Sequence, residues 1–157
     1  MTFVDVIVKN ANSMKDLGEK LGKHLKSRDV VYLIGDLGVG KTTMVQGLVR
    51  GFDYEGRVTS PTFNIMNIYP TKPEIYHYDF YRLEGEELDD LGLEDYLERD
   101  GIALIEWADL QLHVLPEEAL VIKISLTDDD YDKERVVSFK PRGERYISLL
   151  EELRQKC

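Results

Sequence analysis

The stretch Gly35-Asp36-Leu37-Gly38-Val39-Gly40-Lys41-Thr42 decides the fold. It has the P-loop pattern, in which glycines let the backbone approach phosphate while the lysine and the hydroxyl contact phosphate and Mg²⁺. Residues 29–34 before it are almost all apolar, as in a strand buried on both faces. The sequence after it favours a helix from Lys41 to about Gly51. This strand–loop–helix order is the context that a P-loop requires and predicts a nucleotide site.

The rest of the chain predicts a single α/β domain over residues 1–157. We expect further strands at 3–8, 63–69, 75–80, 102–107, 120–126 and 135–140, and further helices at 13–26, 84–99 and 143–155. Ser13 has the residue type of an N-cap for the first helix. Strands follow one another without a helix at 63–80 and at 120–140, which indicates antiparallel pairs beside a parallel core. The predicted fold class is therefore a P-loop NTPase domain, with a mixed sheet and helices on both faces.

Two acidic residues end predicted strands. Asp79 closes the strand at 75–80 and Glu106 nearly closes the one at 102–107. Ligands of α/β sheets bind at the carboxyl ends of the strands, so both acids are candidates to hold Mg²⁺ or to orient an attacking water. Either one could instead just mark a strand end, and the spacing does not say which acid takes which role.

The segment between the P-loop and these acids is more ambiguous. Thr59-Ser60-Pro61-Thr62-Phe63 offers hydroxyl groups that could sense a γ-phosphate, as switch loops do, or could form an ordinary turn. His77 alternates with two tyrosines and is interpreted as a packed or partly exposed histidine and not as a catalytic one. Trp107 is interpreted as core or as the wall of a cleft.

Composition restricts the class of partner. The formal net charge of −10 opposes tight autonomous binding to nucleic acid, because phosphate backbones repel an acidic chain. The single cysteine, Cys157, precludes an intramolecular disulfide. No apolar run of membrane-spanning length and no signal-peptide layout is present, so we expect a cytoplasmic protein without a membrane partner. No Asn-Lys-x-Asp guanine-reading motif occurs, which disfavours a dedicated GTPase.

Four motifs in order and spacing resemble the TsaE family, also called YjeE. They are the P-loop extended to Thr43, Ser60-Pro61-Thr62-Phe63, His77-Tyr78-Asp79-Phe80-Tyr81-Arg82-Leu83, and Leu104-Ile105-Glu106-Trp107. The resemblance covers nearly the whole chain. Val39 replaces an alanine that is common in the family, a mild change at a position that contributes its backbone.

The resemblance implies an activity and partners. Members of the family bind ATP with Mg²⁺, hydrolyse ATP slowly and act with a TsaB–TsaD heterodimer. That heterodimer transfers threonylcarbamoyl to an adenosine beside the anticodon of certain tRNAs, so tRNA would be contacted only indirectly. ATP hydrolysis is expected to reset the complex.

The resemblance also implies site residues. Residues 36–43, with Lys41 and Thr42 foremost, would hold phosphate and Mg²⁺, and Thr62 would be the switch-like hydroxyl. Asp79 and Glu106 would lie near Mg²⁺ and the γ-phosphate, with Trp107 beside them. The remaining positions near the nucleotide would be Asn12 or Ser13, and Arg135.

Other functional classes also use a P-loop. A small-molecule kinase would need an acceptor pocket and arginines that clamp the transferred phosphate. Residues 84–99 are instead strongly acidic, which favours a docking surface over a phosphate clamp. A nucleotide-sensing module that does not hydrolyse ATP remains a third alternative.

Overall fold

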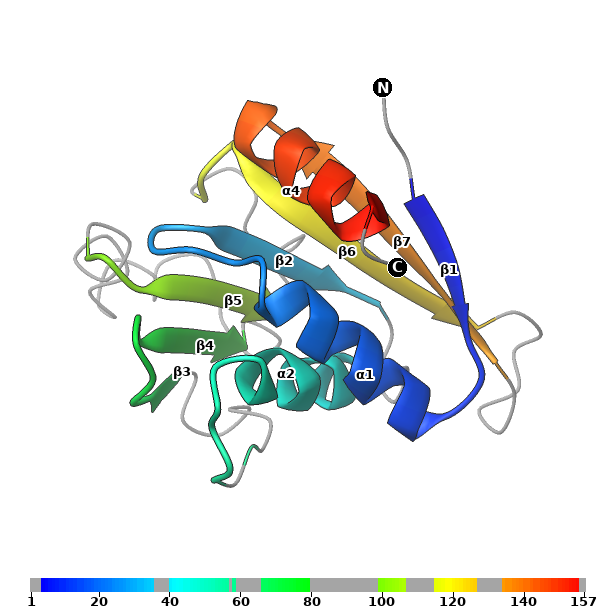
Figure 1. Cartoon of the computed structure of the whole chain (residues 1–157), viewed down its shortest axis with the longest axis horizontal. Coiled ribbons are helices and arrows are strands. Elements are labelled where there is room, and N and C mark those ends of the chain that lie inside the picture. The colour runs from blue at the N-terminus through cyan, green and yellow to red at the C-terminus, as the bar shows by residue number, and fades with distance from the viewer. Residues whose placement is uncertain are drawn as a thin grey trace.

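A seven-stranded sheet forms the centre of the molecule, with strand order β1-β7-β6-β2-β5-β4-β3 (Figure 1). The computed structural model describes residues 4–35, 40–56, 58, 66–79, 99–106, 115–126 and 134–155. The strands are β1 (Val4–Val8), β2 (Val30–Ile34), β3 (Met66–Tyr69), β4 (Ile75–Asp79), β5 (Ile102–Glu106), β6 (Ala119–Leu126) and β7 (Arg135–Arg142). The helices are α1 (Ala11–Gly22), α2 (Lys41–Arg50) and α4 (Glu144–Gln155).

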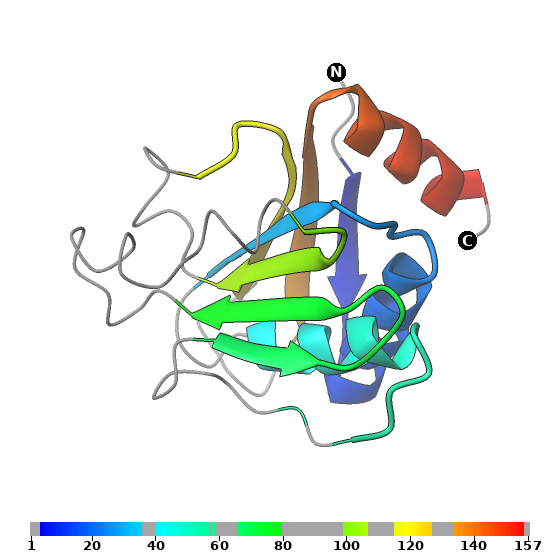
Figure 2. The ribbon, with the colours of Figure 1, turned by 90° about the vertical axis from the view of Figure 1, so that its left-hand side faces the viewer.

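Parallel strands occupy the middle of the sheet and antiparallel strands its two sides. Strand β2 pairs in parallel with β5 and β6, and β5 pairs in parallel with β4. The pairs β3–β4, β6–β7 and β1–β7 are antiparallel. Figure 2 shows β4 and β5 side by side with their arrowheads at one edge, while β3 runs the opposite way. The predicted mixed sheet is confirmed, including both antiparallel pairs.

The three described helices share one core with one face of the sheet. Buried side chains of α1, α2 and α4 pack against alternate residues of the strands, such as Val31 and Leu33 of β2. The intervening residues, Val30 and Tyr32, belong to a second buried cluster on the other face. Apart from Arg99, the helix predicted at 84–99 lies outside the described residues.

Glycines bring α1 and α2 into backbone contact. A methyl group on Gly47 would lie 2.1 Å from the carbonyl oxygen of Lys15, and one on Gly18 would lie 2.5 Å from that of Met44. Gly22 and Gly51 meet the opposite helix in the same way. The glycines therefore set how closely α1 approaches α2, the helix that follows the P-loop.

The N-cap of α1 differs from the sequence prediction. Asn10, with an extended backbone, accepts a hydrogen bond from the Ser13 N–H at 2.8 Å, and the helix begins at Ala11. Ser13 was expected to cap the helix but lies in its first turn. Both residue types can cap, and Asn10 prevails because its side-chain oxygen reaches the N–H three residues ahead.

Helix α4 is fixed to the amino end of β2. Arg145 donates two hydrogen bonds to the Asp29 carboxylate, at 3.0 and 2.8 Å, and another to the carbonyl of His24 at 3.0 Å. The Tyr146 hydroxyl accepts from the N–H of Val30 at 2.8 Å. These contacts hold the last helix at the sheet end opposite the carboxyl ends of the parallel strands. Within the part of the chain that is described, no helix is long and apolar enough to cross a membrane.

Candidate active site

The P-loop sequence lies between the end of β2 and the start of α2. Gly40 precedes α2 with φ 116°, in the left-handed region that favours glycine, and no side chain caps the helix. A methyl group on Gly40 would also lie 3.2 Å from Cε of Met14, in the first turn of α1. The backbone conformation therefore favours glycine here, whereas the flexible end of the Met14 side chain could shift to make room for a methyl group. The first turn of α2 can direct its N–H groups at an anion.

Lys41 bends back toward the end of β2. Its side chain is buried, and its ammonium group donates a hydrogen bond to the carbonyl oxygen of Gly35. A buried ammonium needs polar partners, and this bond holds the charge beside the end of β2. Lys41 is thus positioned at the junction of strand and helix, where the P-loop pattern places phosphate.

The two predicted acids are neighbours. Asp79 and Glu106 are aligned in the register of the parallel strands β4 and β5, and both are buried. Glu106 is also aligned with Leu33 of β2, two residues before Gly35. Paired residues of neighbouring strands point to the same face, here the face that α2 covers, as the burial of Leu33 and Leu104 in the helix-side core shows. The sheet therefore gathers both acids at the edge where Lys41 lies.

His77 lies on the same face of β4 as Asp79, and it is fully buried. Its Nε2 lies 2.5 Å from Oε2 of Glu106, and its Nδ1 lies 3.1 Å from the Tyr69 hydroxyl. Sequence reasoning treated His77 as a packed or partly exposed residue and missed its contact with Glu106. The signal that could have identified it was its i, i+2 spacing from Asp79, which puts both side chains on one face.

Tyr69 is held between two rings. Its ring centroid lies 5.2 Å from that of Tyr54, which follows α2, and 6.0 Å from that of His77. Burial raises the pKa of Tyr69 to about 12, so its hydroxyl keeps its proton at neutral pH. A protonated phenol beside Nδ1 of His77 can donate a hydrogen bond to it.

The other predicted residues are placed as follows. Thr42 and Thr43 lie in the first turn of α2 and are half-buried, and Asn12 is exposed in the first turn of α1. Arg135 begins β7, aligned with Val8 and with Leu126, the last residue of β6. Since β6 runs parallel to β2, Arg135 lies at the same end of the sheet as the P-loop. Asp36, Leu37, Gly38, Val39, Thr62 and Trp107 lie outside the described residues.

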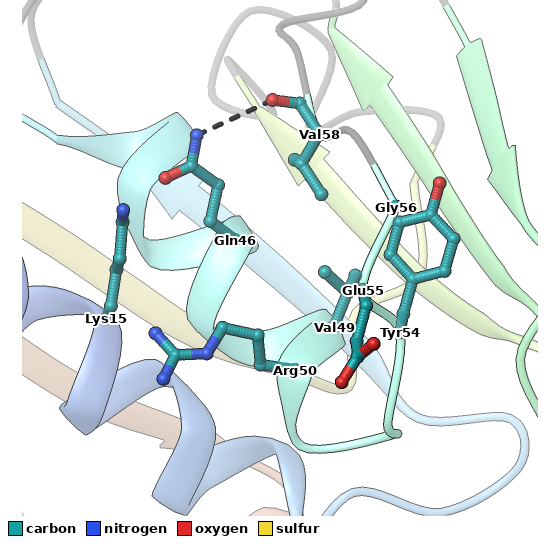
Figure 3. A pocket seen from close by; sticks show the side chains of 8 residues that line it. All are labelled: Lys15, Gln46, Val49, Arg50, Tyr54, Glu55, Gly56 and Val58. Atoms are coloured by element: carbon teal, nitrogen blue, oxygen red, sulfur yellow. Dashed lines mark hydrogen bonds between the residues drawn. The ribbon is translucent and has the colours of Figure 1, made fainter.

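A surface pocket of about 420 Å³ flanks α2 (Figure 3). Its lining combines cations from α1 and α2 with the segment after α2: Lys15, Gln46, Val49, Arg50, Tyr54, Glu55, Gly56 and Val58. The Gln46 amide donates to the carbonyl of Val58 at 3.5 Å, a bond drawn in Figure 3. The pocket thus borders the chain that leads toward Thr59 and the predicted switch-like segment.

Comparison with known proteins decides the family. Residues 8–137 match the family described as threonylcarbamoyl adenosine biosynthesis protein TsaE. The chain belongs to the TsaE family. The matched residues run from the end of β1 into β7, so they include the P-loop, both acids and Arg135. The family that the four motifs resembled is confirmed.

Curated relatives of the TsaE family align over most of their length. A tRNA threonylcarbamoyladenosine biosynthesis protein TsaE from Bacillus subtilis (strain 168) is 41% identical over 145 residues, 92% of this chain and 89% of the relative. One from Haemophilus influenzae is 40% identical over 124 residues, 74% of this chain and 78% of the relative. The crystal structure of Bacillus subtilis YdiB superposes with a TM-score of 0.86 and 33% identity, covering 99% of this chain and 96% of that one. The TsaE fold therefore extends over essentially the whole chain.

Proposed function

We propose that this chain is a Mg²⁺-dependent ATPase that acts with a TsaB–TsaD complex in the threonylcarbamoyladenosine modification of tRNA. The observation that carries the proposal is the position of Lys41, whose ammonium group bridges to the Gly35 carbonyl at the sheet edge that also holds Asp79 and Glu106. A cation on a glycine loop next to two buried acids matches what a metal–triphosphate ligand requires. Membership of the TsaE family links this chain to threonylcarbamoyladenosine biosynthesis.

ATP binding would rest on the loop and the start of α2. Residues 36–40 would surround the phosphates with backbone N–H groups, and Thr43 would add the first turn of the helix. Lys41 would exchange its bond to the Gly35 carbonyl for bonds to phosphate oxygens. Asn12, Trp107 and Arg135 would border the rest of the nucleotide.

The donors at this edge fit Mg²⁺. The Thr42 hydroxyl and the carboxylates of Asp79 and Glu106 are hard oxygen ligands, which Mg²⁺ prefers, and phosphates and waters complete its shell in P-loop proteins. Among the described residues, no cluster of three or more His, Cys, Asp or Glu suited to a metal occurs. Bound there, Mg²⁺ would neutralise charge on the β- and γ-phosphates.

Hydrolysis would require an oriented water at the γ-phosphate. Glu106 is proposed to accept a hydrogen bond from that water, and Asp79 to hold the metal or one of its waters. Thr62 would contact the γ-phosphate from the switch-like segment. Catalysis of phosphoryl transfer relies on positioning and charge stabilisation, so these groups would act without a covalent step on the protein.

The partner assignment rests on the family and on charge. Relatives bear the name of tRNA threonylcarbamoyladenosine biosynthesis proteins. The net charge of −10 makes direct tRNA binding by this chain unfavourable, so the TsaB–TsaD complex would contact the tRNA in the cytoplasm. ATP turnover would then drive a change in that complex.

The test is ATP hydrolysis with and without TsaB–TsaD, for the wild type, Glu106→Ala and Glu151→Ala. Glu151 is an exposed glutamate of α4 and serves as the control. We expect the wild type to hydrolyse ATP slowly and only with Mg²⁺, at a rate that changes when the complex is added. Glu106→Ala should abolish this turnover with little effect on ATP affinity. Glu151→Ala should hydrolyse ATP at the wild-type rate. Phosphate transfer to a metabolite, with no response to the complex, would instead establish a kinase.

A further inference from the structure

A buried hydrogen-bonded chain leads from Tyr69 through His77 to Glu106. We propose that His77 is a positioning residue for hydrolysis, one that fixes the Glu106 carboxylate in its productive orientation and is itself oriented by Tyr69. The inference rests on the proposed ATPase function and extends it to residues without an assigned role there. For this role, the side chains of Tyr69, His77 and Glu106 must be hydrogen-bonded in series, buried, and located at the carboxyl edge of the parallel strands.

The connection follows from the sheet register. His77 is aligned with Leu104 of β5 on one side and with Asn67 of β3 on the other. Glu106 and Tyr69 each lie two residues farther along those strands, so both are diagonal neighbours of His77 on the same face. The imidazole is therefore long enough to span them, with Nε2 toward Glu106 and Nδ1 toward Tyr69.

The partners assign the proton positions. An ionised carboxylate only accepts hydrogen bonds, so Nε2 of His77 carries the proton and donates it to Glu106. A ring that carries a single proton, on Nε2, accepts at Nδ1 from the Tyr69 hydroxyl. Both hydrogen bonds point toward Glu106, and bonds aligned in this way polarise and strengthen one another inside a protein.

Burial makes the arrangement rigid. His77 is 0% exposed and Glu106 is 2% exposed, so no bulk water competes for the bond between them. On the far side, Tyr54 packs on the Tyr69 ring and limits its movement. A carboxylate has about four lone-pair sites, and the bond to His77 fills one of them while fixing the plane of the group. The remaining sites are then directed consistently at water or metal.

Another histidine–glutamate pair offers a matched control. His24 and Glu152 approach to 3.5 Å near the junction of α1 and α4, away from the carboxyl edge. Glu152 is half exposed there, so this pair has neither the burial nor the location that the proposal requires. Replacing His24 removes the same type of contact without touching the site.

The experiment combines ATP affinity with single-turnover hydrolysis for four variants and the wild type. His77→Gln keeps a donor near Nε2, whereas His77→Asn places its donor nearer Nδ1 and leaves Glu106 without one. Tyr69→Phe removes only the hydroxyl and keeps the ring that packs on Tyr54. His24→Leu is the control.

We expect His77→Asn to lower the hydrolysis rate at saturating ATP about 10–100-fold, the usual effect of losing a group that orients a site residue, with the Kd for ATP unchanged. His77→Gln should recover most of the rate, and Tyr69→Phe should cause a smaller loss. His24→Leu should hydrolyse ATP like the wild type. Thermal unfolding identifies any variant that fails to fold. If both His77 variants fail to fold, the hydrolysis rate of Tyr69→Phe still tests the proposal.

The nucleotide-free protein provides an independent readout. The proton shared between His77 and Glu106 should give a slowly exchanging downfield imidazole N–H resonance, present in the wild type and in His24→Leu and absent in His77→Gln. If the wild type hydrolyses ATP and His77→Asn and His77→Gln have equal rates, the role of His77 is overturned while the proposed ATPase function stands. A wild type that does not bind ATP would overturn the proposed function and the inference together.

Discussion

Gly18 and Gly22 of α1 face Gly47 of α2 and Gly51, which follows α2, along a contact that we call the glycine seam. The most quantitative prediction concerns Gly47→Ala in this seam. The added methyl group would lie 2.1 Å from the Lys15 carbonyl oxygen and 2.8 Å from its carbon, whereas Cβ atoms essentially never come within 3.0 Å of such atoms. The helices must therefore separate by roughly 1 Å, in an interior packed too densely to absorb the shift. Both obstacles are backbone atoms, so no rotamer change relieves the clash.

The free energy follows from two opposing terms. Overpacking a core costs about 1–3 kcal/mol, and Gly18 and Gly22 of α1 approach the backbone of α2 similarly closely. Alanine gains about 1 kcal/mol over glycine in helix propensity. With the packing term at its upper end, we expect Gly47→Ala to destabilise the protein by about 2 kcal/mol, lowering Tm by about 4–8 °C for a chain of this size.

The assay is urea unfolding and calorimetry of Gly47→Ala beside Ser148→Ala. Ser148 is exposed in α4, so its replacement isolates the effect of a helical alanine without a clash. Ser148→Ala should leave stability unchanged or slightly raise it. A Gly47→Ala protein as stable as the wild type would refute the close helix contact and the argument that positions α2.

Three further perturbations test separate parts of the structure. Gly40→Ala should weaken ATP binding and lower the free energy of unfolding by about 1–2 kcal/mol, because Gly40 has φ 116°. The control is Gly143→Ala, since Gly143 has φ 118° but lies at the start of α4. Calorimetry should show that this control loses stability but not ATP affinity. Arg145→Ala should cost about 1.5–3 kcal/mol in urea unfolding, because the buried Asp29 carboxylate loses its charged partner; additivity with Asp29→Ala would contradict that pairing. Burial raises the pKa of Tyr69 to about 12, so its contribution to stability should be complete below pH 10 and decline as pH rises toward 12; phenolate absorbance and denaturation midpoints measure this, and a midpoint that rises over that interval would count against it.

Much of the fold could be predicted because its signals are local. The apolar run of β2, the P-loop and the helix after it stand together in the sequence, and the expected ends of β6 and α4 fell within a residue of those observed. The sequence marks Asp79 and Glu106 as candidate site residues because each ends an apolar strand. Their direct alignment then follows from the order of the parallel strands.

The contacts that were missed depend on register between segments that are far apart in the chain. His77 reaches Glu106 and Tyr69 only because β3, β4 and β5 align as they do, and alternation within one strand cannot reveal that alignment. The seam of glycines in α1 and α2 likewise becomes visible only when the two helices are packed. The cap of α1 shifted from Ser13 to Asn10 because neighbouring polar residues compete for the same helix end.

The most direct test of the nucleotide site is the Kd for ATP with Mg²⁺, measured by calorimetry for the wild type, Lys41→Ala and Lys20→Ala. Lys41 is buried against the Gly35 carbonyl, whereas Lys20 is exposed on α1 and controls for the loss of one positive charge. Hydrogen bonds to charged groups contribute about 1.5–3 kcal/mol, so Lys41→Ala should weaken binding at least about tenfold, with Lys20→Ala close to the wild type. Equal affinity for all three proteins would contradict the assignment of this loop as the phosphate site.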